Sequence, residues 1–313
     1  MIMVIAWYGE IMAKLLRLAR PHFLIAGLSL FFFGAFWAIL NGAAISPLRL
    51  VLGYLIVFLG QLSISFSNDY FDVAVDSYGS PTLFSGGSGI LVKYPNLRQP
   101  ARRIAIALIL CSLALAVIYM FEFAFPVWFL GYVLVADLLG WFYAAPPLRL
   151  SYRKLGEVSN ILASGLLIPG LGYLALRGSI NGPAFLFVLP LMLYGLAFIL
   201  SVEIPDLEMD LQGHKDTLVS RIGRRAGFIL VGFSLILAST SFFCISLFIS
   251  HGYPINFHYL GLFSLLPFGA GVMDAIRHPV DLRQSIGFVN GTIISIAVFL
   301  TASLVYLILL ATH

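Results

Sequence analysis

Charged residues are scarce in this sequence: Asp, Glu, Lys and Arg together make up 10% of its 313 residues, whereas 60% are hydrophobic. Several apolar runs reach about 20 residues, which is the length that a helix needs to cross a bilayer. The composition therefore excludes an ordinary soluble domain and indicates a polytopic membrane protein. The net charge of +4 comes mostly from Lys and Arg in particular loops, so it gives no reason to expect a nucleic-acid partner.

Cysteine and histidine are also rare. The two cysteines, Cys111 and Cys244, each lie within an apolar run, where we expect packing rather than a disulfide or a metal site. The six histidines show no H-x-x-x-H spacing, which argues against a zinc site. The N-terminus lacks the charge order and the small-residue cleavage site of a signal peptide. We therefore expect the first apolar segment to be retained.

The apolar runs predict an all-α fold of nine transmembrane helices that form a single membrane-embedded domain over residues 1–313. The expected spans cover residues 22–41, 47–66, 104–122, 126–145, 157–176, 183–203, 227–250, 258–275 and 285–311. Residues 1–20 differ, because Lys14, Arg17 and Arg20 are interleaved with leucines. This pattern predicts an amphipathic helix on the membrane surface.

The positive charges predict the orientation, since short loops rich in Lys and Arg stay in the cytoplasm. Of the 18 Lys and Arg residues, 16 fall in the N-terminal segment and in the loops after the second, fourth, sixth and eighth expected spans. Only Arg49 and Arg177 lie on the other side. We therefore expect a multi-pass protein of the cell membrane, with a cytoplasmic N-terminus and a C-terminus outside.

Acidic residues are concentrated in two short segments at the borders of expected spans. Eight of the 14 acidic residues lie within residues 69–76 and 203–216. In each segment, a four-residue spacing places polar side chains on one face of a helix. The residues with this spacing are Asn68, Asp72 and Asp76 in the first segment, and Asp206 and Asp210 in the second. Such oxygen ligands suit Mg²⁺, which is usually held by one or two carboxylates while substrate phosphates complete its shell. The sequence predicts a diphosphate site at the cytoplasmic membrane surface.

The two acidic segments follow the second and the sixth expected spans, so a four-helix unit is weakly repeated. We expect the two clusters to face each other across a helix bundle. Polar stretches over residues 77–103 and 207–225 are expected to form a cytoplasmic cap of loops and short helices. Such a cap would exclude water from a reactive cation below it. Pro205 is expected to kink or end the sixth span.

Two runs carry a more specific signal: Asn68-Asp69-Tyr-Phe-Asp72 with Asp76, and Asp206-Leu-Glu-Met-Asp210. They resemble the N-D-x-x-D-x-x-x-D and D-x-x-x-D motifs of the UbiA superfamily of intramembrane prenyltransferases. Arg20-Pro21 and the run from Tyr143 to Arg149 agree with this resemblance, which covers nearly the whole chain. It implies a Mg²⁺-dependent enzyme that transfers a polyprenyl group from its diphosphate to an aromatic acceptor through an allylic cation. The lipid bilayer is the third expected partner.

Two further runs bear on the acceptor. The run Phe84-Ser-Gly-Gly-Ser-Gly89 is similar to the 1,4-dihydroxy-2-naphthoate prenyltransferases of menaquinone synthesis. The run from Gly213 to Leu218 resembles the G-K-x-T-L motif of that branch, and Asp216 departs from it. The resemblance therefore implies 1,4-dihydroxy-2-naphthoate as the acceptor. 4-Hydroxybenzoate and geranylgeranylglyceryl phosphate are alternative acceptors for the same chemistry.

The resemblance also implies roles for the acidic residues. Asn68 and Asp72 would bind one Mg²⁺, and Asp206 with Asp210 a second, so that two ions neutralise the leaving diphosphate. Asp76 would ligate directly or through water. On a helix, Asp69 is turned about 100° from this face, where it would orient the ligands or assist deprotonation. The predicted catalytic residues are Asp69, Asp72, Asp206 and Asp210.

Six more residues are candidates for binding the diphosphate or the acceptor. Three are cations expected near the site, where they would grip an anion or simply anchor the cytoplasmic side. Tyr143 would shield the cation through its ring. Asp137, an acid within a span, would face the same cavity or hydrogen-bond between helices. Asn160 would contact the acceptor or another helix. The three cations are Arg149, Lys154 and Lys215.

A different class of protein, a membrane cation transporter, would also use paired carboxylates. Transport predicts carboxylates near the bilayer midplane and discontinuous helices. Nearly all the acidic residues here lie at one border of the expected spans. This distribution favours the prenyltransferase over the transporter.

Overall fold

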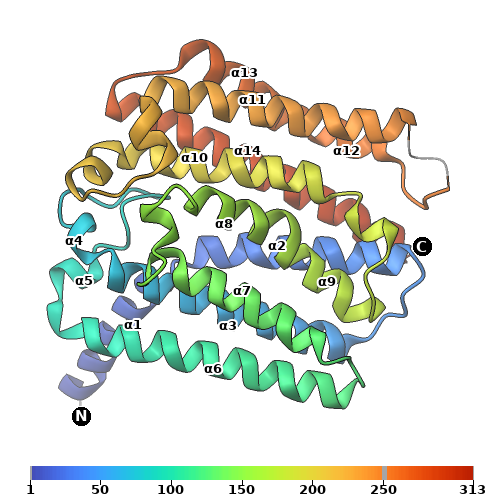
Figure 1. The fold of residues 1–313 in the computed structure, drawn as a ribbon, viewed down its shortest axis with the longest axis horizontal. Helices are drawn as coiled ribbons and strands as arrows, with labels where there is room; N and C mark the ends of the chain where they lie inside the picture. The colour runs from blue at the N-terminus through green and yellow to red at the C-terminus, as the bar shows by residue number, and fades with distance from the viewer. Residues whose placement is uncertain (1, 249–251, 313) are drawn as a thin grey trace.

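The computed structural model describes residues 2–248 and 252–312, and this part of the chain is helical and contains no strand. Most of the long helices lie side by side along one common axis, and α1 (Ile2–Ala19) runs obliquely to it (Figure 1). The short helices α4 (Val73–Asp76) and α5 (Ile90–Lys93) lie together at one end of this bundle, and α14 (Leu282–Thr312) ends at the other. The prediction of an all-α fold is confirmed for the described residues.

The other helices complete the bundle and connect its ends. The long ones are α1 (Ile2–Ala19), α2 (Pro21–Leu40), α3 (Pro47–Phe71), α6 (Arg98–Glu122), α7 (Trp128–Ala144), α10 (Val188–Gln212) and α11 (Leu218–Phe248). The shorter ones are α8 (Gly156–Leu162), α9 (Ile168–Arg177), α12 (Phe257–Phe263) and α13 (Leu265–Arg277). Single turns form η1 (Pro95–Leu97), η2 (Leu150–Tyr152), η3 (Ala163–Leu167) and η4 (Gly182–Phe185).

Within the described residues, seven helical segments are long and apolar enough to cross a membrane. They cover Pro21–Leu40, Pro47–Phe71, Pro95–Glu122, Gly156–Arg177, Gly182–Gln212, Leu218–Phe248 and Leu282–Thr312. Helices α12 and α13 are bent by 41° and make an eighth segment only if they are counted as one span. Helix α7 is apolar but has 17 residues, which is at the short limit for a crossing. The nine expected spans thus correspond to seven long helices, one bent pair and one short helix.

The sixth expected span continues beyond the predicted end. Pro205 lies inside α10, which runs on to Gln212, so the alternative that Pro205 ends this helix is wrong. Proline removes one backbone hydrogen bond, and a helix that is buried among its neighbours tolerates that loss. As a result, the segment expected to be a polar loop over residues 207–225 is mostly helical. Only residues 213–217 connect α10 to α11.

Helix α1 packs near the end of the bundle that carries α4 and α5 (Figure 1). Leu18 is fully buried in a small apolar cluster with Phe66 of α3 and Leu91 of α5. Met12 and Leu16 are exposed. One apolar side of α1 is therefore packed against the bundle, and another is exposed. Of residues 1–20, which the sequence predicted to be amphipathic, residue 1 lies outside the described residues.

Helices α2 and α9 approach each other more closely than side chains would allow. A Cβ added to Gly34 would lie 1.8 Å from the carbonyl oxygen of Pro169, and one added to Gly172 would lie 1.9 Å from that of Phe31. Glycine at these contacts allows the two backbones to touch, as small residues do between membrane helices. This contact fixes α2, which begins beside the acidic residues, against α9.

Candidate functional site

The first acidic segment keeps helical spacing although α3 ends at Phe71. The backbone N–H of Asp72 donates to the carbonyl of Asn68, and that of Asp76 donates to Asp72, each at 2.8 Å. Because both are hydrogen bonds between residues four apart, Asn68, Asp72 and Asp76 lie along one face. The structure thus retains the spacing that the sequence suggested.

The end of α10 packs directly on this segment. A Cβ on Gly213 would lie 2.6 Å from the Val75 side chain, and one on Gly79 would lie 2.8 Å from Met209 Sδ. These contacts join α4 to α10 at one end of the bundle (Figure 1). The two acidic segments, about half the chain apart, therefore meet in space.

Lys215 lies between the two acidic segments. Its Nζ donates to Asp72 Oδ2 at 2.9 Å, and both side chains are largely buried. Burial alone would lower the pKa of Lys215, but the carboxylates of Asp72 and Asp210 raise it well above its ordinary value. Tyr152 adds a second donor, since its hydroxyl donates to Asp72 Oδ1 at 2.8 Å. Lys215 is therefore a permanent positive charge at the centre of the site.

The glycine-rich run Phe84–Gly89 lies against the acidic residues. Gly86 N–H donates to Asp206 Oδ2 at 3.1 Å, and Ser88 N–H donates to Asp69 Oδ2 at 3.1 Å. The Ser88 hydroxyl also hydrogen-bonds Asp69. A Cβ on Gly87, which has φ +64°, would lie 2.1 Å from Asp76 Oδ2. The run therefore contacts three of the predicted site carboxylates with backbone atoms, and a left-handed glycine allows that approach.

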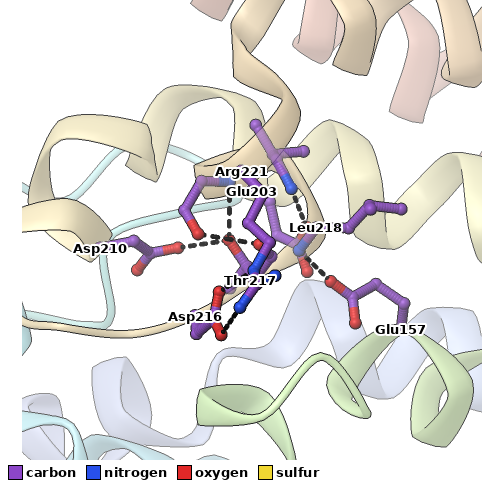
Figure 2. Close-up of polar contacts among 9 residues, drawn as sticks. Glu157, Glu203, Asp210, Asp216, Thr217, Leu218 and Arg221 are labelled. Atoms are coloured by element: carbon purple, nitrogen blue, oxygen red, sulfur yellow. Dashed lines mark hydrogen bonds and ion pairs between the residues drawn. The ribbon is translucent and has the colours of Figure 1, made fainter.

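Carboxylates also hold the first turn of α11 beside the site (Figure 2). Leu218 N–H donates to Glu157 of α8, and Val219 N–H donates to Glu203 Oε2 of α10 at 3.5 Å. Thr217 Oγ1 donates to Asp210 Oδ2 at 3.3 Å. Acidic groups satisfy the free N–H groups at a helix start and suit its dipole. Residues 213–217, which connect α10 to α11 and include Lys215, are thus held in place where α11 begins.

Asp216, the departure from the sequence motif, is partly exposed and lies beside Arg221 (Figure 2). It forms an ion pair with Arg221 at 2.6 Å, with Nε and Nη2 each donating to one of its oxygens. The hydrogen bond from Arg221 keeps the pKa of Asp216 below its ordinary value. This ion pair at the surface accounts for Asp216, which is not one of the buried acidic residues of the site.

The buried acidic residues bring several carboxyl groups close together and include oxygen atoms without a hydrogen-bond partner. Burial, together with the neighbouring Asp72 and Asp69 carboxylates, raises the pKa of Asp76 to about 8. Within the described part of the chain, Asn68 Oδ1 and Asp210 Oδ1 are buried and have no hydrogen-bond partner. Both features favour a bound cation, and oxygen donors fit a hard ion such as Mg²⁺.

In the described residues, the acidic side chains of the site do not by themselves form a complete metal-binding site. Among residues 2–248 and 252–312, no three Asp, Glu, His or Cys side chains are gathered as a metal site. Asp72 is held by Lys215 and Tyr152, and Asp206 by the Gly86 N–H. Mg²⁺ commonly takes only one or two carboxylates and completes its shell with water and phosphate. The donor set therefore fits Mg²⁺ that arrives with a diphosphate.

Two other predicted cations lie at the rim of the site. Arg149 is exposed, and its guanidinium lies 4.5 Å from the centre of the Tyr152 ring. Lys154 is also exposed, and its backbone N–H donates to the Asp216 carbonyl at 3.0 Å. Both residues have positive φ angles of 46° and 60°. The structure therefore places Lys215 inside the site, and Arg149 and Lys154 around it.

The remaining candidates are divided between the site and the helix contacts. Tyr143 is partly buried and packs near Gly156, within electrostatic reach of Lys215. Asn160 Nδ2 donates to the Gly195 carbonyl at 2.9 Å, joining α8 to α10. Asp137 packs against α3, because a Cβ on Gly60 would lie 2.5 Å from its Oδ1. Asn160 and Asp137 thus take part in helix–helix contacts.

Four residues of the site were not among the predicted ones. They are Tyr152, Glu157, Ser88 and Arg20. Arg20 begins α2 in a left-handed conformation with φ 48° and interacts electrostatically with Asp69 and Asp206. Arg20 and Ser88 lie in the runs Arg20-Pro21 and Phe84–Gly89, which were a usable signal. Nothing in the spacing of Tyr152 or Glu157 singles them out.

Comparisons with known proteins bear on the family and the fold. The sequence profile of the UbiA prenyltransferase family matches residues 27–290. The chain is 25% identical over 233 residues to a 1,4-dihydroxy-2-naphthoate octaprenyltransferase from Bacillus subtilis (strain 168), covering 73% of this chain and 72% of the relative.

Solved structures share the fold. A UbiA homologue from Archaeoglobus fulgidus bound to DMAPP and Mg²⁺ has a TM-score of 0.67 and 17% identity, covering 94% of this chain and 99% of that one. A structure described as a digeranylgeranylglyceryl phosphate synthase in membranes has a TM-score of 0.63 and 17% identity, covering 96% and 99%. At these identities, the likeness shows the helical arrangement alone.

Proposed function

The chain belongs to the UbiA prenyltransferase family, as its acidic motifs indicated, and we propose that it transfers a polyprenyl group from a polyprenyl diphosphate to an aromatic acceptor. It is a multi-pass membrane protein, and members of this family are enzymes. We also propose an orientation in the cell membrane: the acidic end of the bundle and the N-terminus face the cytoplasm, and the C-terminus lies outside. The bias of Lys and Arg toward these loops supports this orientation.

One observation carries the proposal: two acidic segments from separate parts of the chain meet around the buried Lys215, under a glycine-rich run. The positive charge of Lys215 suits the oxygens of a diphosphate. Five oxygen-bearing residues around it would hold two Mg²⁺ ions. Asn68 and Asp72 would hold one ion, Asp206 and Asp210 the other, and Asp76 would ligate directly or through water.

The geometry suits ionisation of an allylic diphosphate. Bound Mg²⁺ would neutralise the charge that develops on the leaving group. Lys215 adds a fixed positive charge beside it, and Tyr152 orients Asp72 through its hydroxyl. The allylic C–O bond breaks with its electron pair moving to the diphosphate. A ring carbon of the acceptor then forms the new C–C bond, and the ring loses a proton or CO₂.

The same chain provides shielding and proton transfer. The run Phe84–Gly89 lies over the acidic residues and would exclude water from the allylic cation. Asp69, which Ser88 holds by two hydrogen bonds, would accept a proton from the acceptor or orient the metal ligands. Arg149 and Lys154 at the rim would attract an anionic substrate, and the ring of Tyr143 would stabilise the cation.

We assign 1,4-dihydroxy-2-naphthoate as the acceptor. The similarity to the Bacillus subtilis relative and the glycine-rich run support this assignment. Two alternative acceptors share the ionisation of the donor. 4-Hydroxybenzoate would form the new C–C bond at a ring carbon with loss of a proton, whereas the hydroxyl of geranylgeranylglyceryl phosphate would form an ether C–O bond and lose its proton.

The acceptor is tested by direct comparison. The purified protein in nanodiscs receives geranylgeranyl diphosphate and Mg²⁺, with each of the three acceptors in parallel. We expect prenylated product and CO₂ with the naphthoate alone. Product with another acceptor would contradict the assignment of the acceptor and leave the reaction class intact. No product with any acceptor, together with no diphosphate release, would contradict the proposed reaction.

A further inference from the structure

Arg224 is a buried arginine outside the acidic site, and its guanidinium connects several elements. Its side chain is 7% exposed, and Nη2 forms an ion pair with Glu208 Oε2 at 2.6 Å. Nε donates to the Ile204 carbonyl at 3.3 Å, and Nη1 donates to the Val280 carbonyl at 2.9 Å. Arg224 of α11 thus binds α10 at two points and also binds the residues that connect α13 to α14.

The place of Arg224 depends on a break inside α11. Gly223 has φ 81° and ψ 165°, a backbone conformation that is essentially restricted to glycine. Arg224 is the first residue after this break, and the next residue, Arg225, is exposed. Two adjacent arginines therefore have different environments, since one is buried against α10 and the other is not.

The two contacts of Arg224 on α10 lie on either side of Pro205. Because proline has no N–H group, α10 lacks the hydrogen bond that residue 205 would donate to the Ser201 carbonyl. The helix nevertheless continues to Gln212. Arg224 binds the backbone at Ile204, directly before the proline, and the side chain of Glu208, three residues after it. The guanidinium therefore bridges the position at which the helix has lost a hydrogen bond.

The part of α10 beyond Pro205 carries the second acidic segment. Asp206 and Asp210 are each two residues from Glu208, and two residues correspond to a rotation of about 200° around a helix. The ion pair with Glu208 therefore lies on the side of α10 away from these two carboxylates. A contact on that side fixes the position of both carboxylates without occupying their oxygens.

We propose that Arg224 is a positioning residue, which holds the turns of α10 after Pro205 so that Asp206 and Asp210 meet the first acidic segment. The inference rests on the proposed function, which assigns these two carboxylates to Mg²⁺ and diphosphate. A residue that only stabilises the fold would be equally important with or without a proline at position 205. A residue that bridges the proline loses its importance when Pro205→Ala restores the N–H group.

The two adjacent arginines allow a matched test in a double-mutant design. Arg224→Gln and Arg225→Gln are each made with Pro205 and with Pro205→Ala. The first measurement is the Mg²⁺ concentration for half-maximal turnover of geranylgeranyl diphosphate with 1,4-dihydroxy-2-naphthoate. The second is amide hydrogen exchange in residues 206–212 in the presence of EDTA, which requires neither metal nor substrate.

We expect Arg224→Gln to raise the half-maximal Mg²⁺ concentration at least fivefold and to accelerate exchange in residues 206–212 at least threefold. In the Pro205→Ala protein, both effects should fall below twofold. Arg225→Gln should change neither quantity. Equal effects of Arg224→Gln with and without Pro205, or no effect in either protein, would overturn the proposal and leave the proposed function standing.

Glu208→Gln provides the test if Arg224→Gln does not fold, because Glu208 is 54% exposed and only one contact of Arg224 is weakened. We expect both quantities to change at least twofold in the same directions, and again less with Pro205→Ala. Unchanged values would overturn the proposal. Absence of turnover in the wild type with every acceptor would contradict the proposed function, and the exchange rates in EDTA would then decide whether Arg224 holds α10.

Discussion

Lys215 Nζ lies 2.9 Å from Asp72 Oδ2, and this ion pair joins residues that are 143 positions apart in the chain. It connects the segment between α10 and α11 to the end of α3, at the point where the two acidic segments meet. Both side chains are mostly shielded, with 15% of Lys215 and 9% of Asp72 exposed. The positive charge offsets part of the repulsion among the surrounding carboxylates.

Lys215→Met removes this charge and leaves Asp72 and Asp210 without their cation. Breaking a buried ion pair by removing one partner costs about 3 kcal/mol. We therefore expect a lower thermal midpoint in the presence of EDTA and a larger rise on addition of Mg²⁺ than in the wild type. Lys154→Met, which removes an exposed cation, is the control. Equal midpoints for the wild type and both variants would contradict the structural role of Lys215.

Tyr152→Phe removes the hydroxyl that donates to Asp72 Oδ1. Because a hydrogen bond to a charged group contributes about 1.5–3 kcal/mol, we expect kcat/KM for the prenyl donor to fall about 10- to 100-fold. Tyr78→Phe is the matched control, since Tyr78 is 54% exposed. A Tyr152→Phe enzyme with normal kcat/KM would show that the orientation of Asp72 does not depend on Tyr152.

Gly87→Ala places a methyl group against Asp76, since the added Cβ would lie 2.1 Å from Asp76 Oδ2. The φ of +64° adds a backbone cost of about 1–2 kcal/mol for alanine. We expect the glycine-rich run to shift, and the Mg²⁺ concentration for half-maximal turnover to rise. Gly291→Ala is the control, because no atom lies within 4 Å of its added Cβ. The same Mg²⁺ dependence in both variants would exclude a contribution from this contact.

Glu157→Gln weakens the start of α11, where Glu157 accepts the hydrogen bond from Leu218 N–H. Loss of a capping interaction costs about 1 kcal/mol. We expect faster amide hydrogen exchange in residues 218–222 and a slightly lower thermal midpoint. Glu122→Gln changes an exposed acid at the end of α6 and serves as the control. Unchanged exchange in Glu157→Gln would show that this carboxylate does not hold the turn.

The helices themselves could be predicted, because long apolar runs admit few structures other than membrane helices. The residues at which the helices end could not be predicted. Pro205 is a local signal for a break, yet the packing of α10 carries the helix to Gln212. Similarly, the apolar run over residues 258–275 is divided by a bend of 41° between α12 and α13, which hydropathy does not register.

Part of the site followed from spacing alone. The i, i+4 pattern of Asn68, Asp72 and Asp76 persists because the backbone hydrogen bonds continue past Phe71. The choice among the cations did not follow, since Arg149, Lys154 and Lys215 all lie in polar segments at the same expected side of the membrane. Only the packing of α10 against α4 brings Lys215 among the buried acidic residues of the site and leaves Lys154 exposed.

Polar residues within the spans were the least predictable. Asn160 and Asp137 each suited either a substrate contact or a contact between helices. The hydrogen bond from Asn160 to the Gly195 carbonyl and the packing of Asp137 on Gly60 involve helix pairs that sequence patterns do not specify. Tyr152 reaches Asp72 across 80 residues, which is equally invisible in one sequence.

The most direct test of the site is Mg²⁺-dependent release of diphosphate from geranylgeranyl diphosphate in the presence of 1,4-dihydroxy-2-naphthoate. The wild type is compared with Asp72→Ala, Asp206→Ala and the surface control Asp216→Ala, after each protein is shown to keep its thermal midpoint in detergent. We expect turnover in the wild type and in Asp216→Ala, none with EDTA, and none in Asp72→Ala or Asp206→Ala. Retained turnover in folded Asp72→Ala or Asp206→Ala would contradict the assignment of the acidic segments as the catalytic site.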